Sequence, residues 1–519
     1  MRQFARALSD LDNGYDVPPM PRLTPTVFLL AAFAVAVGCQ EQALDDDTSS
    51  GADDDDDGDD DDTPVTGELS VEPRANNVLS CVVRWTTDSP ATTELTATEQ
   101  GGESFVWTDE QPSTDHEVWV LGLREQSLHS LEAVSRDLDG DIVWLADGSF
   151  ESGQLPFPMP MVTRTAHDPD RVQPGWTLTS FLVDSDLDHR AAVLLDEEGA
   201  VRWYHEFDSM GAMAAVQVSR VEGGEHVLVG PLPDEGQRPF EVTLAGELVW
   251  EGPEQPALGL SGYMHHTLQK LSGGDYLALT YDYVEGDQID VIEQIDADGT
   301  VAWRWDSGAL VAELGSGLWA NAVQVDLEAG TVYVNSRMHS LLFRVDRASG
   351  DVVWSLGADG DFTAVGGHTD PWFSGAHATT RLPDGNVLAY DNGNGARDYS
   401  RAIEYALDEE AHTAEVVWEF PGALAEVDWY TSVWGDVDRL ANGNTLITAG
   451  SMIAGDSTSQ IFEVTREGQV VWGLEVEGVA PDERAGVYGS ERVDPLVSPL
   501  PAAASAASRS IRSEAEHST

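Results

Sequence analysis

The segment AAVLLDEEGAVRW at residues 191–203 decides the fold, because its pattern returns five more times along the chain. Each copy has an apolar strand, a turn with Gly or an acidic residue, and a closing V-x-W or L-V-W. The other copies are PFEVTLAGELVW (239–250), IEQIDADGTVAW (292–303), LFRVDRASGDVVW (342–354), AIEYALDEEAHTAEVVW (402–418) and IFEVTREGQVVW (461–472). Successive tryptophans lie 47 to 64 residues apart, about the length of one four-stranded propeller blade. The sequence therefore predicts an all-β fold whose main domain, residues 155–496, is a six-bladed β-propeller.

A second repeated element, a strand followed by a tight turn and another strand, precedes most of these copies. It reads RVEGGEHVLV (220–229), KLSGGDYLAL (270–279), RLPDGNVLAY (381–390) and RLANGNTLIT (439–448). Two hairpins per repeat supply the four strands of one blade. The tryptophans of the first element are expected to wedge between neighbouring blades and to have no catalytic role.

The polar residues that begin the inner strands are candidate site residues, because the inner strands of a propeller gather around one central channel. Alignment on the following turn places His266, Asn321 and His377 at equivalent positions, and Gly435 in the same place in the last blade. His265 precedes His266, and strand alternation directs only one of these two side chains into the channel. We favour His266.

Residues 67–153 carry short alternating strands, LSVEP, SCVVRWTT, TELTAT, HEVWVLGL, LHSLEAVSRD and GSFES, separated by turn residues. This spacing predicts a small β-sandwich ahead of the propeller. Its W-x-T motif and D-x-D-G turn resemble a fibronectin type III domain. Cys81 is expected to be a small buried apolar residue. The histidines outside the candidate site, His116 and His129 among them, are expected at the surface or in loops.

The N-terminal segment indicates export. Residues 26–38, TVFLLAAFAVAVG, are too short to span a bilayer but suit the core of a signal peptide, which we assign to residues 1–39. The following AVGC resembles a bacterial lipobox with Cys39 as the lipidated residue. An ordinary signal peptide with an incidental cysteine is the alternative, and Met20 would be a better start than Met1. Since Gln40 rather than Asp follows, the resemblance implies an outer-membrane anchor, on the periplasmic face or the cell surface.

Charge limits the partners of the chain. Its 27 basic and 92 acidic residues give a formal net charge of −65. Such a polyanion repels nucleic acid and anionic lipid, so we expect no nucleic-acid partner and membrane contact only through the lipid. Residues 40–66 hold three runs of Asp and are predicted to be a disordered linker. Residues 497–519, rich in Ala and Ser, are predicted to be a disordered tail.

Long runs in the repeat region resemble the bacterial arylsulfotransferases. They are NAVQVDLEAGTVYVNSRMHSLLFRVDRASGDVVWSLGADGDF (321–362), WFSGAHATTRLPDGNVLAYDNG (372–393), YTSVWGDVDRLANGNTLITAGS (430–451) and VYGSERVDPL (487–496). The resemblance covers residues 160–496 in order. It implies a periplasmic propeller that moves a sulfuryl group from a phenolic sulfate ester to a phenol, without a nucleotide sulfate donor.

The resemblance also assigns roles to the candidate residues. His377 matches the family's nucleophilic histidine, which is sulfated transiently in a ping-pong cycle, and imidazole suits that role as a neutral nucleophile and a good leaving group. Arg337 matches the arginine that holds the sulfuryl oxygens. His266, or its neighbour His265, matches a histidine that donates to the bridging phenolic oxygen, and Asn321 can hydrogen-bond a sulfuryl oxygen. The resemblance implies aryl sulfates and phenols as substrates, and we expect no cofactor and no metal.

The chain departs from the family pattern near these residues. The family carries a third active-site histidine where this chain has Trp319, which could stack on an aryl ring. The Asp that often follows the family's histidines is replaced by Thr267 and Ala378. Tyr430 and Trp434 are expected to form walls for an aromatic acceptor.

Two other functions remain open. The chain could be a non-catalytic propeller lipoprotein that binds partners at the cell surface, which Trp319 and the acidic linker allow. The repeats could also indicate a quinone-cofactor propeller, but those domains commonly have eight blades and need calcium-ligand acids in the channel. Retention of His377, Arg337 and the DNG turn at 391–393 favours sulfuryl transfer.

Overall fold

The computed structural model of the protein describes residues 65–100, 102, 104–157, 159–184, 190–207, 216–231, 236–255, 262–284, 287–421, 429–450, 458–478 and 484–496. The predicted signal peptide with Cys39, the linker up to residue 64 and the tail from residue 497 lie outside the described residues. The described residues all fall within one compact unit. Strands dominate them, with one short α-helix, α2 (Gly308–Leu314), and one 3-10 turn, η1 (Glu222–Gly224). The predicted all-β class is confirmed.

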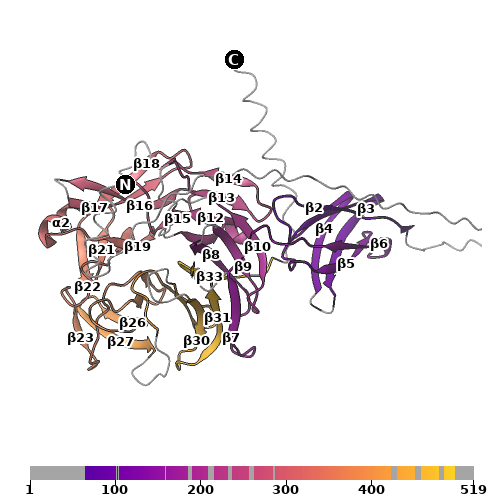
Figure 1. Cartoon of the computed structure of the whole chain (residues 1–519). Coiled ribbons are helices and arrows are strands. Elements are labelled where there is room, and N and C mark those ends of the chain that lie inside the picture. The colour runs from indigo at the N-terminus through magenta and orange to yellow at the C-terminus, as the bar shows by residue number, and fades with distance from the viewer. Residues whose placement is uncertain are drawn as a thin grey trace, which may run out of the picture. The chain divides into compact units, whose positions relative to one another are not determined.

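Six strands before residue 152 form the first sheet, in the order β1-β6-β5-β3-β2 with β4 beside β3 (Figure 1). They are β1 (Val65–Thr66), β2 (Ser70–Pro73), β3 (Cys81–Glu99), β4 (Ser104–Val120), β5 (Leu128–Arg136) and β6 (Ile142–Glu151). Val65 and Thr66, predicted to belong to the linker, instead pair in parallel with β6. The edge of β6 offers backbone groups that need partners, and these two residues provide them.

Strand β3 joins two strands that the sequence suggested were separate, at 80–87 and 93–98. Its first part pairs with β2 and β4, and its last part pairs with β4 and β5. Side chains along β3 alternate between buried and exposed. This alternation keeps one face of the strand on a core that contains Cys81, which is fully buried as expected.

Two histidines of this sheet are buried, which contradicts their predicted place at the surface. His116 is 3% exposed and His129 is fully buried. The His116 ring lies between the hydroxyls of Thr87 and Thr93, with Nε2 and Nδ1 at 3.1 and 2.7 Å from them. Such hydrogen-bond partners offset the cost of burying a neutral imidazole. The alternation of apolar and polar residues along a strand does not reveal them.

Six further sheets follow in the described part of the chain. Three of them have four strands and three have five. The first contains β8 (Trp176–Asp184), β9 (Arg190–Leu195), β10 (Val201–Glu206), β32 (Arg484–Gly486) and β33 (Ser490–Val493). The second contains β11 (Gln217–Val221), β12 (His226–Gly230), β13 (Phe240–Thr243) and β14 (Leu248–Glu251). The third contains β15 (Leu268–Lys270), β16 (Tyr276–Val284), β17 (Asp287–Ile295) and β18 (Val301–Asp306).

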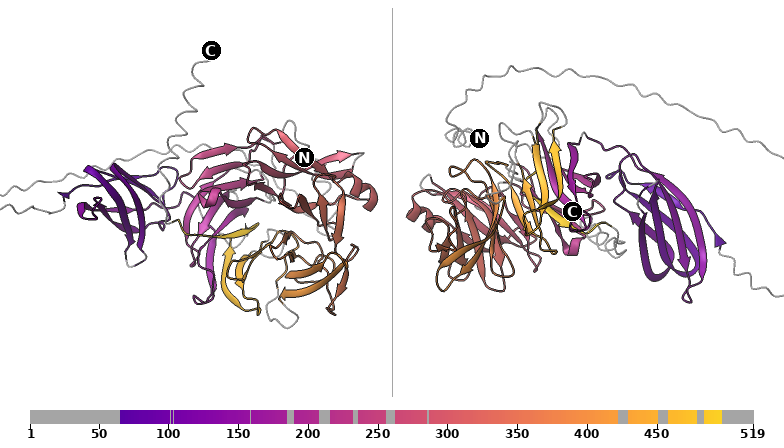
Figure 2. Two further views of the ribbon diagram at one scale, coloured as in Figure 1. Left: turned by 180° about the vertical axis from the view of Figure 1, so that it is seen from behind. Right: turned by 90° about the horizontal axis from the view of Figure 1, so that it is seen from below.

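The remaining three sheets follow the same order. The fourth contains β19 (Ala320–Asp326), β20 (Thr331–Ser336), β21 (Leu341–Asp346) and β22 (Val352–Leu356). The fifth contains β24 (Ala378–Arg381), β25 (Val387–Asp391), β26 (Arg401–Asp408), β27 (Thr413–Phe420) and a parallel edge strand, β23 (Thr363–Val365). The sixth contains β28 (Asp436–Arg439), β29 (Thr445–Ala449), β30 (Thr458–Val464), β31 (Val470–Glu477) and β7 (Met161–His167). Figure 2 shows these sheets from behind and from below.

A strand from the start of the repeat region pairs with the last sheet, and two strands from its end pair with the first sheet. β7 pairs with β31 of the sixth sheet, and β32 and β33 pair with β8 of the first sheet. None of these three strands belongs to the repeated sequence pattern. They join the beginning and the end of the repeat region through backbone hydrogen bonds.

The six repeated tryptophans link each sheet to the next. The indole Nε1 of Trp203 donates to Leu244 O at 2.7 Å, and that of Trp472 donates to Glu197 O of the first sheet at 2.9 Å. The other four bonds, each 3.0 Å long, run from Trp250 to Ala297 O, from Trp303 to Arg347 O, from Trp354 to Glu409 Oε2 and from Trp418 to Arg466 O. The series passes through all six sheets and returns to the first.

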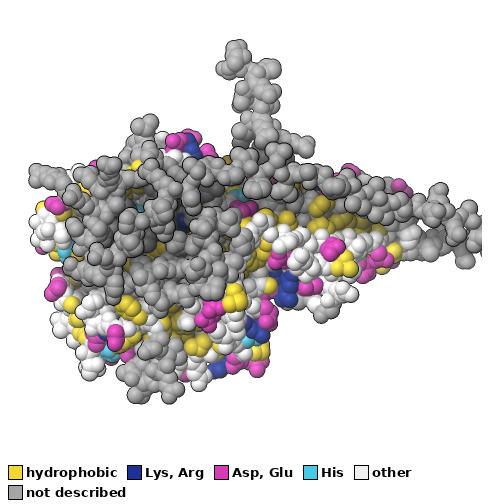
Figure 3. Space-filling view, viewed as in Figure 1, with side chains coloured by type: hydrophobic (Ala, Val, Ile, Leu, Met, Phe, Trp, Pro, Cys, Tyr) yellow, Lys and Arg dark blue, Asp and Glu magenta, His cyan; other side chains and the backbone are white. Residues whose placement is uncertain are grey.

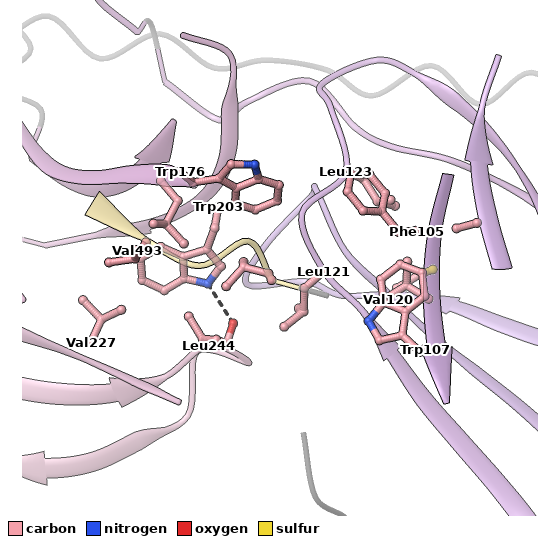
Figure 4. Close-up of a cluster of buried hydrophobic side chains, with 14 of the residues drawn as sticks. Phe105, Trp107, Val120, Leu121, Leu123, Trp176, Trp203, Val227, Leu244 and Val493 are labelled. Carbon is pink, nitrogen blue, oxygen red and sulfur yellow. Dashed lines mark hydrogen bonds between the residues drawn. The ribbon is translucent and has the colours of Figure 1, made fainter. Parts of the chain in front are cut away.

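The N-terminal sheet shares one hydrophobic cluster with the first two of these six sheets. Leu121 and Leu123, just beyond β4, belong to the same cluster as Trp176 and Trp203 (Figure 4). Polar contacts reinforce it: the Arg124 guanidinium lies 2.9 Å from Asp196 Oδ2. The N-terminal sheet and the first two of the six sheets therefore share one core. Acidic side chains are scattered over the visible described surface (Figure 3).

Candidate active site

A cavity of about 900 Å³ lies where the six sheets meet. The strands β11, β15, β19, β24, β28 and β33, one from each sheet, supply most of its lining. Three of the predicted site residues, His266, Asn321 and His377, are among the lining residues. These three residues, which the alignment of inner-strand starts placed at equivalent positions, therefore line the same cavity.

Gly435, the fourth aligned position, also lines the cavity, and its lack of a side chain has a structural reason. Its φ is +116°, and a Cβ there would lie 2.2 Å from the Tyr390 ring. A side chain at this start of β28 would therefore displace Tyr390, which is fully buried.

His377 is held in one orientation by a partner that the sequence did not suggest. Its Nδ1 lies 2.9 Å from Asn392 Oδ1, and the side chain is 4% exposed. The Asn392 amide nitrogen donates to Thr431 O at 2.7 Å and to Trp434 O at 2.9 Å. Two carbonyl acceptors fix which end of the amide is nitrogen, so Oδ1 faces His377 and accepts from Nδ1–H. Nε2 is then the unprotonated ring nitrogen.

The electrostatic surroundings keep His377 neutral. Burial, reinforced by the positive charge of Arg337, lowers the pKa of His377 to about 3. Only the hydrogen bond to Asn392 acts in the opposite direction. The ring therefore presents a lone pair at any pH near neutrality.

His265 and His266 both lie at this site, and their contacts settle how they share it. The His266 ring centroid is 6.2 Å from that of His377, and His266 lines the cavity, as we predicted. His265 lies behind it, with the two Nδ1 atoms 2.9 Å apart. His266 has a φ of +57°, a left-handed backbone that turns consecutive side chains toward one another rather than to opposite faces. The alternation of an extended strand does not apply here.

Both rings are neutral. Burial lowers the pKa of His265 to about 4. Burial, together with His265, His377 and Arg337, lowers the pKa of His266 well below its usual value. The positive charge of Arg337 contributes to the lowered pKa of both His266 and His377, although Arg337 is not among the lining residues of the cavity.

Arg337 follows β20 and is mostly buried. Its Nη2 donates to Ser432 O at 3.3 Å, and its backbone N–H donates to Trp319 O at 3.3 Å. Its Nε has no partner among the described residues. Burial lowers the pKa of Arg337, but an arginine stays charged. The site thus contains a fixed positive charge with donor capacity to spare.

Asn321 is 4% exposed and shares an acceptor with a neighbour. Its Nδ2 lies 3.5 Å from Ala376 O, and Asn335 Nδ2 donates to the same carbonyl at 2.6 Å. Ala376 immediately precedes His377, so both amides hold the backbone that carries this histidine.

The three predicted aromatic wall residues have different surroundings. Trp319 is half-buried with a φ of +52°, and Tyr430 is 38% exposed and donates from its hydroxyl to Asn394 Oδ1 at 3.1 Å. Trp434 is 4% exposed and belongs to the hydrophobic core, where its ring lies 6.0 Å from that of Tyr488. None of the three is among the lining residues of the cavity.

Besides Asp326, three carboxyl groups that the site prediction left out line the cavity. Asp436, Asp438 and Glu491 lie on β28 and β33. Burial raises the pKa of Asp436 to about 6, and burial together with Asp436 raises the pKa of Asp438 well above its usual value. The sequence did carry a signal for two of them, because Asp436 and Asp438 are two residues apart on one strand and so point to the same face. Among the described residues, no three His, Cys, Asp or Glu side chains gather so that they could hold a metal ion.

The fold and the site together define an all-β protein with a central cavity, two neutral imidazoles among its lining residues and the buried guanidinium of Arg337. The chain belongs to the arylsulfotransferase family, since the family model for arylsulfotransferase (ASST) matches residues 165–484. Its function is accordingly arylsulfotransferase-like. A comparison with curated proteins finds no match.

Several solved structures show a distant likeness. A protein of unknown function from Bacteroides caccae shares 12% identity, with 62% of this chain and 99% of that chain covered and a TM-score of 0.40. The periplasmic gluconolactonase of Pseudomonas aeruginosa also shares 12% identity, with 60% and 99% covered and a TM-score of 0.36. A putative 6-phosphogluconolactonase from Bacteroides fragilis shares 13% identity, with 79% and 99% covered and a TM-score of 0.34. At these TM-scores the likenesses support no conclusion about this chain.

Proposed function

We propose that the protein transfers a sulfuryl group from an aryl sulfate to a phenol through a covalent intermediate on His377, without a nucleotide sulfate donor. The observation that carries this proposal is the bond between His377 Nδ1 and Asn392 Oδ1, which leaves the lone pair on Nε2. A sulfuryl acceptor must be neutral and unprotonated, and burial keeps the pKa of this imidazole at about 3.

In the proposed first half-reaction, His377 Nε2 attacks sulfur and the donor phenolate leaves. Negative charge moves over the sulfuryl oxygens and the bridging oxygen as this bond breaks. Arg337 supplies positive charge to the sulfuryl oxygens, and Asn321 supplies an amide donor. His266 faces the bridging oxygen. In the second half-reaction a phenol gives its proton to His266 and attacks sulfur, the bond between sulfur and His377 Nε2 breaks, and His377 leaves as a neutral imidazole.

The proposal includes an architecture. The six sheets are the blades of one β-propeller, and β7, β32 and β33 close it by completing the sixth and first sheets. The first sheet, with its long β3 and β4, is a fibronectin type III-like domain. The ring of tryptophan hydrogen bonds supports six blades in a closed order.

We further propose that the protein is exported and anchored to the outer membrane through a diacylglyceryl group on Cys39. The lipobox-like AVGC after an apolar run supports this. In the part of the chain that the structure describes, no helix is long and apolar enough to cross a bilayer. Replacing Cys39 by Ser should move the mature protein from the membrane fraction to the soluble fraction, and a variant that stays with the membrane would contradict the anchor.

The transfer reaction is tested with purified protein, a chromogenic aryl sulfate and a second phenol. Release of the chromogenic phenol together with sulfation of the second phenol is the expected result. With donor alone, mass spectrometry should find one added SO₃ on the peptide that contains His377, and His377→Ala should abolish both label and transfer. A label on another residue, or transfer by the alanine variant, would contradict the mechanism.

A further inference from the structure

We propose that Asp290, His265 and His266 form a proton relay, which takes the proton of the acceptor phenol and returns it to the phenolate of the next donor. This inference rests on the proposed sulfuryl transfer and assigns two positioning residues, Asp290 and His265, that act through His266.

The three side chains form a line that leads away from the cavity. His266 Nδ1 lies 2.9 Å from His265 Nδ1, and His265 Nε2 lies 3.8 Å from Asp290 Oδ1. The latter distance is longer than a hydrogen bond, and catalytic hydrogen bonds that are long without substrate often tighten once substrate is bound. His265 Nε2 also lies 3.3 Å from Thr280 O, so this nitrogen faces acceptors on both sides.

Asp290 is a buried carboxyl whose second oxygen is not satisfied. It lies in the middle of β17 and is fully buried, and its Oδ2 has no partner among the described residues. Its Oδ1 accepts from Ala320 N at 3.3 Å. Burial raises the pKa of Asp290 to about 7, against backbone donors at 318–320 that lower it. Near neutral pH this carboxyl can therefore both give and take a proton.

The contacts define two proton arrangements that differ by one proton. With Asp290 ionised, His265 holds its proton on Nε2 and accepts through Nδ1, so His266 must donate from Nδ1. The lone pair of His266 Nε2 then faces the cavity and can accept a proton. With Asp290 protonated, every donor reverses: Asp290 donates to His265 Nε2, His265 Nδ1 donates to His266 Nδ1, and His266 presents Nε2–H to the cavity.

Alternation between these arrangements balances each turnover. In the first half-reaction the donor C–O–S bridge breaks between oxygen and sulfur, and sulfur bonds to His377 Nε2. The phenolate takes the proton from His266 Nε2, the relay shifts, and Asp290 becomes ionised. In the second half-reaction the acceptor phenol gives its proton to His266 Nε2 and attacks sulfur, and Asp290 becomes protonated again. No proton needs to come from solvent.

The structure also allows a purely structural role for Asp290, because it anchors the backbone before Asn321. The dependence on the leaving group separates the two roles. A weakly basic phenolate, such as that of 4-nitrophenyl sulfate, leaves without a proton, whereas that of phenyl sulfate needs one. A misplaced Asn321 would slow both donors alike.

The test compares single-turnover sulfation of the full-length protein by these two donors in the absence of acceptor. Asp290→Asn keeps an oxygen for the backbone donors at 318–320 but cannot hold the proton. We expect it to lose on the order of 10²-fold or more in rate with phenyl sulfate and less than about threefold with 4-nitrophenyl sulfate. His265→Gln should show the same pattern, and the double variant should lose no more than either single one.

The matched control is Asp287→Asn, on the same strand but exposed, which should leave both rates unchanged. Equal losses with both donors, or no loss in either relay variant, would overturn the relay while leaving the transfer reaction intact. If the unsubstituted protein sulfated His377 from neither donor, the proposed function would fall and the relay with it. Should Asp290→Asn not fold, His265→Gln decides by the same comparison.

Discussion

Replacing Asn392 by Ala should separate the orientation of His377 from the stability of the fold. The substitution removes the acceptor of His377 Nδ1–H and two donated bonds, to Thr431 O and Trp434 O. Leaving the buried Nδ1–H of His377 without an acceptor costs about 1 to 3 kcal/mol. Loss of the tautomer preference should lower kcat about 10- to 100-fold, because the ring then spends most of its time with Nε2 protonated or turned away.

The assay is steady-state release of 4-nitrophenol with phenol as acceptor, read alongside urea unfolding. Loss of the two bonds that Asn392 donates should also lower the free energy of unfolding by about 2 to 4 kcal/mol. Asn444→Ala is the matched control, since Asn444 is 8% exposed and also donates twice, to Arg171 O and Glu463 Oε1. It should lose similar stability and keep its kcat. An Asn392 variant with unchanged kcat would refute the assignment of the tautomer to this amide.

Three further predictions concern stability and the site. Trp472→Phe should lower the free energy of unfolding by about 1 to 3 kcal/mol, measured by urea unfolding, because Glu197 O loses its donor. An unchanged value would mean that this bond adds nothing to the link between the sixth sheet and the first. The free energy of unfolding should fall as pH drops from about 6.5 toward 3. Histidines of the unfolded chain take up protons near pH 6.5, whereas burial holds the pKa of folded His377 at about 3 and that of His265 at about 4. His377→Asn should weaken this pH dependence, as measured by unfolding at pH 7 and pH 5. Arg337→Lys should lower kcat about 100-fold in the transfer assay and leave the urea midpoint near normal, because an ammonium group cannot make the two parallel hydrogen bonds of a planar guanidinium. An unchanged kcat would show that Arg337 does not stabilise the transition state.

The repeated sequence predicted more of the fold than of the site, for a physical reason. Strand alternation and turn residues are local, so residues such as Trp303 and Gly385 mark their elements without knowledge of the rest of the chain. The segments that form β7, β32 and β33 lack the repeated pattern. They are strands because each pairs with the free edge of a sheet. The same holds for Val65 and Thr66, whose pairing depends on the free edge of β6.

In the site, periodicity found the residues that face the cavity and missed those that stand behind them. His266, Asn321 and His377 share a place in the repeat, and the structure brings them to one cavity. Asn392 and Asp290 act through space from other strands, and no spacing in the sequence links either one to its histidine. Trp434 was assigned to the cavity on its aromatic character, but its left-handed backbone places the ring in the core.

The pairing of β8 with β32 and β33 has a consequence for the order of assembly. The innermost positions of the first sheet are filled by residues 484–493, more than 290 positions after β8 begins. Because a polypeptide is synthesised from its N-terminus onward, this sheet cannot be completed until residue 493 has been made. Until then β8 keeps an open edge, at which Thr179 lacks the Gly489 carbonyl that its hydroxyl later finds at 2.8 Å. The first sheet is therefore completed late in synthesis, and a chain truncated after β31 would retain that open edge as a place for wrong association between molecules.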